Sequence, residues 1–242
     1  MRATMKMKWI YLAYLVAAIT VLLALSAHAQ KQTDIAASID GNFTQSSASG
    51  VDVQTPSNSI GGLLEVRHII NPWIGFEATY SYNNANQVYG YSILIPVRCP
   101  ALATCYQSGI SVSAYAQTIT GDWVISKRIG KFRPFVVAGG GVLRTLPDGE
   151  QPSHPNINNM PTGTAFVFQV PSINSGEDES VFVFGTGLDW SVSSHLGLRL
   201  QYREYIYKSP LLVLSSAYVG GAALTNHYSH SQQPALGVYY RF

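Results

Sequence analysis

Hydrophobic and polar residues alternate along most of the chain after residue 30, with the two-residue period of a β-strand. The last strand is the clearest, because its apolar residues share one face while Gly237, Tyr239 and Arg241 share the other. Further segments have the same period, although glycines at 139–141 weaken the alternation in one of them. The pattern predicts eight strands, near residues 35–43, 60–70, 74–82, 111–128, 133–146, 180–190, 196–203 and 236–242.

The predicted connections are alternately short and long. Short connections are expected at 71–72, 129–132 and 191–195, and long ones at 45–58, 84–110, 147–179 and 209–229. Short turns at one end and long polar loops at the other are typical of an outer-membrane barrel. An even number of strands then places both termini on the side of the short turns, which is the periplasm. A soluble β-sandwich is the alternative, but it gives no reason for this sorting of loop lengths.

Residues 164–170 are the main irregularity in this pattern. They alternate like a strand, but they are short against the roughly 9–11 residues of a spanning strand, and a ninth strand would spoil the even count. We expect a hairpin extension above the membrane, paired with residues 181–184 or nearby.

Aromatic residues gather toward the predicted strand ends. Trp73, Trp123 and Trp190 each lie close to a predicted short turn, where an interfacial girdle is expected. Several tyrosines lie toward the long loops and predict the opposite girdle: Tyr80, Tyr82, Tyr89, Tyr91, Tyr205 and Tyr207.

The N-terminus has the three parts of a secretory signal peptide. Arg2, Lys6 and Lys8 precede an apolar run over 9–25, and small residues follow at Ala27 and Ala29. We expect residues 1–29 to be removed and residues 30–242 to form one exported barrel domain. The alternative is an uncleaved anchor, because the apolar run approaches a spanning length.

Composition narrows the function. Charged residues make up 12% of the chain, about half the usual share, and aromatic residues another 12%, which excludes a disordered chain. The formal charge of +2 depends on bases in the expected signal peptide, which argues against a nucleic-acid binder. Cys99 and Cys105 predict a disulfide in an oxidising compartment. Two thiolates with no nearby His supply only half a metal site, so no metal or cofactor is expected.

Three segments resemble the small outer-membrane β-barrels of the OmpA-like and opacity-type group. They are residues 130–141 (GKFRPFVVAGGG), 196–203 (LGLRLQYR) and 233–242 (QPALGVYYRF). The resemblance covers the expected mature chain and implies an eight-stranded antiparallel up-and-down transmembrane barrel. It also implies that the alternating residues Leu236, Val238, Tyr240 and Phe242 are the signal read by the barrel-assembly machinery. Outer-membrane lipid and lipopolysaccharide would surround such a barrel.

The polar face of the strands collects charges that would lie in a narrow lumen. These residues are Asp40, Glu65, Arg67, Glu77, Asp189, Arg199, Arg203 and Arg241. Side chains just fill the interior of a barrel of this size, and buried charges persist there only when paired. We therefore expect a charged network that largely fills the lumen. The alternative is a narrow, gated channel for small solutes that opens when such pairs break.

One further constellation suggests chemistry. His227 and Ser229 have the His-x-Ser spacing that resembles outer-membrane lipid A deacylases, in which a His activates a hydroxyl. No Asp or Glu follows Glu204 to orient the imidazole. We therefore expect a non-enzymatic protein with a structural or surface-interaction role, and keep the channel and the lipid A-modifying enzyme as alternatives. The loops do not identify a surface ligand.

Overall fold

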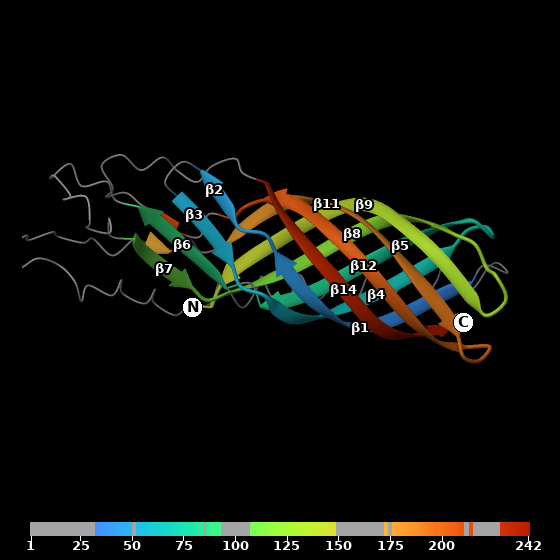
Figure 1. Ribbon diagram of the computed structural model, residues 1–242. Helices are drawn as coiled ribbons and strands as arrows, with labels where there is room; N and C mark the ends of the chain where they lie inside the picture. Colours follow the sequence, from blue (N-terminus) through green and yellow to red (C-terminus); the bar gives the residue numbers. More distant parts are fainter. Residues whose placement is uncertain are drawn as a thin grey trace, which may run out of the picture.

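Eight antiparallel strands close into a barrel in the computed structural model, in the order β1-β14-β12-β11-β9-β8-β5-β4 (Figure 1). The structure describes residues 32–49, 52–84, 86–92, 107–148, 172–173, 176–210, 213–214 and 228–242. The barrel strands are β1 (Thr33–Thr44), β4 (Ser59–Ile69), β5 (Ile74–Asn84), β8 (Ala114–Ser126), β9 (Phe132–Pro147), β11 (Glu177–Ser191), β12 (Leu196–Lys208) and β14 (Tyr228–Arg241). Each strand pairs with its neighbours in this sequence, and β1 closes the ring against β14. The predicted eight-stranded antiparallel barrel is confirmed.

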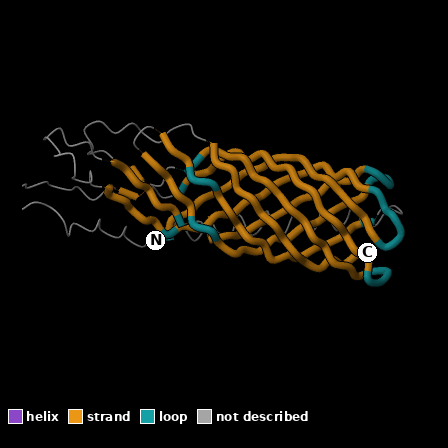
Figure 2. Tube along the Cα trace, viewed as in Figure 1, coloured by secondary structure: helices purple, strands orange, loops and turns teal. Residues whose placement is uncertain are grey.

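Short turns connect the strands at the end of the barrel where the chain finishes (Figure 2). Side chains hold two of these turns: Asn71 Oδ1 accepts hydrogen bonds from the backbone N–H groups of Trp73 and Ile74, both at 2.9 Å, and Ser193 Oγ accepts one from Leu196 at 3.0 Å. The backbone N–H of Phe242 donates to the Thr33 carbonyl at 3.0 Å. The start of β1 and the end of the chain therefore lie at this same end.

The opposite end extends well beyond a membrane span. β9 and β11 have 16 and 15 residues, against the roughly 9–11 that a bilayer requires. Two of the connections expected to be long loops also contain strands: β2 (Ser47–Ser49), β3 (Asp52–Pro56), β6 (Gln87–Ser92) and β7 (Gln107–Val112). These form a four-stranded sheet in the order β2-β3-β6-β7, beyond the barrel in Figure 1. A second pair joins β10 (Ser172–Ile173) to β13 (Val213–Leu214).

Residues 181–184, the segment expected with its surroundings to pair with residues 164–170, are not free to do so. Val181 is already paired with Gly141 of β9 and Tyr207 of β12, and Phe184 with Ala138 and Glu204. Both edges of this segment are therefore occupied within the barrel. Residues 164–170 themselves lie outside the described residues.

Alternation sorts the side chains into an apolar outside and a polar inside. On β12, Leu200 is 58% exposed, while its neighbour Arg199 is fully buried in the lumen. The facing of residues 135–142, which the sequence pattern leaves weakly defined, places Phe135 and Val137 inside the barrel. No helix among the described residues is long and apolar enough to cross a membrane.

Candidate functional site

Ion pairs cross the middle of the lumen and connect opposite walls of the barrel. Arg67 Nε donates to Glu77 Oε2 at 2.6 Å on the neighbouring strand, and Arg67 Nη1 reaches Asp189 Oδ2 on the far wall at 3.0 Å. Arg203 of β12 pairs across the barrel with Glu77 of β5, and its Nη1 lies 2.9 Å from Asp122 Oδ2. The side chains in these pairs are completely buried.

Arg199 joins this network from the same inward face of β12, four residues before Arg203. Its Nε lies 2.7 Å from Asp189 Oδ1, and its Nη1 lies 3.4 Å from both Glu65 Oε2 and Glu77 Oε2. Gln201 Nε2 donates to the other Glu65 oxygen at 2.7 Å. Each guanidinium therefore faces more than one carboxylate, which compensates for the loss of hydration that makes isolated buried charges unfavourable.

A second layer of charge lies toward the short turns. Arg241 Nε donates to Asp34 Oδ1 at 2.8 Å, and Arg133 Nη1 lies 3.7 Å from Asp34 Oδ2. Arg199 Nη2, at 4.0 Å from the same Asp34 oxygen, connects this layer with the middle of the lumen. Below the central network, the lumen is therefore also filled by paired charges.

Aromatic rings support the guanidinium groups from inside the barrel. The Arg67 guanidinium lies over the Phe135 ring at 4.0 Å, and Arg241 lies over the Tyr239 ring at 5.1 Å. Gly187 makes room for Phe135, since a Cβ at this glycine would lie 2.3 Å from the Phe135 Cζ atom. The glycine thus lets an aromatic side chain fill space that the charged side chains leave.

Seven of the eight residues expected in the lumen lie together in these two layers, and Asp40 does not. Its carboxylate is buried, but it forms no ion pair with any described residue. Three charged residues of the two layers were absent from the expectation: Asp34, Asp122 and Arg133. Asp122 could have been found, because it alternates with Thr118 and Thr120 on the buried face of β8.

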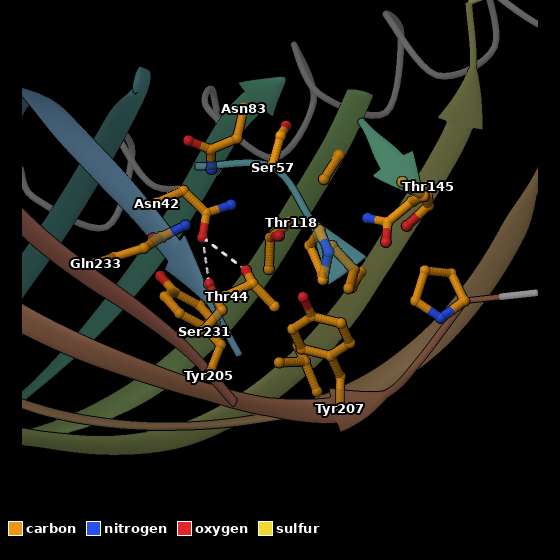
Figure 3. Close-up of a pocket in the computed structure, with 16 residues that line it drawn as sticks. Asn42, Thr44, Ser57, Asn83, Thr118, Thr145, Tyr205, Tyr207, Ser231 and Gln233 are labelled. Carbon is orange, nitrogen blue, oxygen red and sulfur yellow. Dashed lines mark hydrogen bonds between the residues drawn. The ribbon is translucent and has the colours of Figure 1, made fainter. Parts of the chain in front are cut away.

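The upper lumen, toward the extra sheet, is polar but mostly uncharged. A cavity of about 20 Å³ lies there, bordered by neutral side chains that include Asn83, Tyr205 and Gln233 (Figure 3). Above it, Gln54 of β3 donates to Gln87 Oε1 of β6 at 2.9 Å and to the Pro210 carbonyl at 3.1 Å. Segments from three different connections therefore meet over the mouth of the barrel.

The outer surface carries the three tryptophans expected to meet lipid, whereas Tyr205 and Tyr207, which were expected in the opposite girdle, face the inside of the barrel. Trp73, Trp123 and Trp190 are 52%, 59% and 44% exposed and lie toward the short turns. Trp190 stacks on Phe132, with ring centroids 6.3 Å apart. The four residues of the expected barrel-insertion signal, Leu236, Val238, Tyr240 and Phe242, all lie exposed on one face of β14 and the residue that follows it.

Of the His-x-Ser pair that resembles lipid A deacylases, the structure describes only Ser229. Ser229 is 3% exposed, and its hydroxyl lies 2.6 Å from Ser209 Oγ on the inner side of the barrel, away from the lipid-facing surface. His230 points outward instead and pairs with Glu204 at 2.9 Å. His227, Cys99 and Cys105 lie outside the described residues.

Comparison with known proteins places this barrel in a family. A profile of the outer membrane protein beta-barrel domain matches residues 17–242. A search of curated proteins finds no significant match.

Several solved barrels are similar to this chain at low sequence identity. Neisserial surface protein A is 13% identical, with a TM-score of 0.53, over 87% of this chain and 97% of that protein. The attachment invasion locus protein Ail of Yersinia pestis, in complex with the heparin analogue sucrose octasulfate, is 12% identical, with a TM-score of 0.45, over 88% of this chain and 100% of that one. OprG of Pseudomonas aeruginosa is 13% identical, with a TM-score of 0.44, over 87% and 95%. The chain belongs to the outer membrane protein beta-barrel domain family and is an outer-membrane barrel.

Proposed function

We propose that this protein is a non-enzymatic scaffold of the outer membrane, whose closed barrel holds a folded surface at the cell exterior. The single observation that carries this proposal is the filled lumen. Guanidinium and carboxylate groups from opposite walls meet in the middle of the barrel with no side-chain exposure. A solute path through this layer would require several buried ion pairs to separate at once, each leaving charges uncompensated.

The extra sheet supports the surface part of this role. Strands from the first two long connections pair with each other through β3 and β6, and Gln54 and Gln87 anchor them over the barrel mouth. Backbone pairing of this kind presents a fixed surface, in contrast to independent loops. We propose that this sheet contacts molecules outside the cell, and that outer-membrane lipid and lipopolysaccharide surround the barrel below it.

The biogenesis of the protein follows the same proposal. Residues 1–29 act as a cleaved signal peptide, and residues 30–242 form the mature barrel, which the assembly machinery recognises through the outward face of β14 and Phe242. Mass spectrometry of the protein isolated from outer membranes would then give a chain that begins at Gln30. A chain that retains residues 1–29 would contradict this cleavage. The predicted disulfide between Cys99 and Cys105 is tested in the same way, by a mass spectrum recorded under non-reducing conditions.

Single-channel recording distinguishes a scaffold with a closed lumen from a narrow channel for small solutes. The refolded protein is placed in a planar bilayer, using only material whose gel mobility changes on boiling, which marks a folded barrel. We expect no discrete openings, because the central ion pairs block the lumen. Openings that disappear or change in size in Arg199→Met would contradict the scaffold and support a channel for small solutes.

A further inference from the structure

The turn between β8 and β9 gathers exposed cations at the short-turn end of the barrel. Lys127, Arg128 and Lys131 lie within five consecutive residues, and all of them are exposed. None of them forms an ion pair with a residue in the part of the chain that the structure describes. The short turns at 70–73, 127–131 and 192–195 contain no Asp or Glu. The positive charge of this turn is therefore not balanced by an exposed acidic side chain at the same end.

Backbone hydrogen bonds hold this turn in a defined position. Ile129 and Phe132 exchange two of them, at 2.7 and 3.0 Å, around Gly130, whose φ of 61° suits a tight hairpin loop. The backbone N–H of Ser191 donates to the Lys131 carbonyl at 2.8 Å and connects the turn to the next strand end. The cations therefore lie on a fixed rim at this end of the barrel (Figure 2).

The same turn borders the apolar outer surface. Lys127 Nζ lies over the Trp73 ring at 4.8 Å from its centroid, and the backbone N–H of Ser126 donates to the Trp73 carbonyl at 2.8 Å. Exposed apolar side chains flank the turn: Ile125, Ile129 and Phe132. Trp prefers the headgroup level of a membrane, and Lys and Arg extend their charged ends toward it. The cations are therefore placed beside lipid headgroups rather than in bulk water.

The exposed charges at the opposite end of the barrel are mixed in sign. Asp148 and Asp178 are exposed there, and Arg144 Nε lies 3.4 Å from Asp178 Oδ1. Lys208 lies close enough to Glu179 for an electrostatic interaction. An anionic membrane surface would therefore attract the short-turn end more strongly than the long-loop end.

We infer that residues 127–131 bind the phosphate groups of anionic phospholipids, of the phosphatidylglycerol class, in the leaflet that faces the short turns. Basic side chains beside a membrane attract such lipids over a Debye length, about 8 Å at physiological ionic strength, so the cations need not converge on one phosphate. A soluble polyanion fits less well, because Trp73 and the apolar neighbours place the charges next to lipid. The inference rests on the proposed orientation, in which this leaflet is the periplasmic one, and not on the closed lumen or the surface sheet.

The lipid preference of the refolded barrel tests this surface. The protein is reconstituted in phosphatidylcholine bilayers, and electron paramagnetic resonance gives the association constant of spin-labelled phosphatidylglycerol relative to spin-labelled phosphatidylcholine. We expect a relative constant above one that declines with added salt. Its excess over one should fall by about half or more in Lys127→Gln/Lys131→Gln. Lys127→Arg/Lys131→Arg should retain it. Arg144→Gln/Lys208→Gln, the matched control, removes two cations from the opposite end and should also retain it.

Several outcomes overturn the inference. They are a natural sequence without preference for phosphatidylglycerol, a preference that Lys127→Gln/Lys131→Gln retains, and a preference that the control variant loses instead. Inorganic phosphate that abolishes the preference at constant ionic strength would show a site for free anions rather than a lipid surface. Only material whose gel mobility changes on boiling is used, so a variant that does not fold cannot imitate a loss.

The two leaflets of these bilayers have the same composition, so the result does not depend on the orientation of the barrel. A failure of the inference therefore leaves the proposed scaffold untouched. Conversely, discrete openings in the single-channel recording would contradict the scaffold without changing the lipid preference.

Discussion

The middle and the upper part of the lumen are built from the same strands but hold charge in opposite ways. In the middle, Arg67, Arg199 and Arg203 each contact two or more carboxylates, and no side chain of the network is exposed. In the upper part, one carboxylate, Asp40, lies among neutral amides and hydroxyls. The comparison teaches that charges can be buried in this barrel where strands on opposite walls both supply them. Where only one wall supplies a charged side chain, as at Asp40, the carboxylate has no arginine partner among the described residues.

The largest expected effect comes from removing one cation of the middle layer. Arg203→Met leaves Asp122 buried without its arginine and removes one of the three arginines that face Glu77, and we expect a loss of about 3–5 kcal/mol in the free energy of unfolding, measured by urea in micelles. Lys208→Met changes an exposed cation on the same strand and should alter it by less than about 0.5 kcal/mol. If the two substitutions lower the free energy of unfolding equally, the lumen charges are as well solvated as the exposed ones.

A charged side chain that faces lipid should destabilise the barrel at the same level where a charged side chain in the lumen is paired and tolerated. Leu200 faces outward between Arg199 and Gln201, and Leu200→Arg should lower the free energy of unfolding in bilayers by about 2–4 kcal/mol. Gln117→Arg, which lies toward the extra sheet on the outward face of β8, should cost at most about 1 kcal/mol. If both arginines cost the same, the apolar band does not lie where the outward alternation places it.

The next largest loss of stability is expected from disturbing the aromatic rings that pack under the guanidinium groups. Gly187→Ala would place a Cβ 2.3 Å from Phe135, so the ring must move from beneath Arg67, and we expect a loss of about 1–3 kcal/mol. Gly62→Ala on the outer face meets no atom within 4 Å and should be nearly neutral by the same measurement. A neutral Gly187→Ala would mean that the ring does not support the network.

The smallest effect is expected for an ion pair outside the lumen. Arg144 and Asp178 lie 3.4 Å apart with side chains 36% and 60% exposed, and solvent screens such a pair. Asp178→Asn should change the free energy of unfolding by less than about 1 kcal/mol, and less still at high salt. A larger loss would show that exposed pairs stabilise this barrel as strongly as buried ones.

The sequence was sufficient for the barrel because lipid imposes a strict rule on each strand. Outward residues such as Leu200 must be apolar, so the two-residue period reveals which face each strand turns inward. The extra sheet has no such constraint, and nothing in the expected loops at 45–58 and 84–110 predicts that β3 and β6 pair. Local alternation also identifies charged residues on the inner face without identifying their partners.

Those partners depend on closure and register, which local sequence does not contain. Arg67 and Glu77 face each other on one hairpin, but Asp189 reaches the same arginine only because β4 and β11 lie on opposite walls. Asp34 escaped the expectation because it immediately precedes the strand start that the alternation indicates, and Asp40 was expected in the network because it shares that strand's inner face.

A double-mutant cycle between Arg67 and Glu77 tests the central claim most directly. The free energy of unfolding is measured for Arg67→Met, Glu77→Gln and the double variant, beside the same cycle for Arg144 and Asp178. We predict a coupling of at least about 1.5 kcal/mol for the buried pair, in the range of close, desolvated charge pairs, and below about 1 kcal/mol for the exposed pair. No coupling between Arg67 and Glu77 would contradict a lumen closed by paired charges.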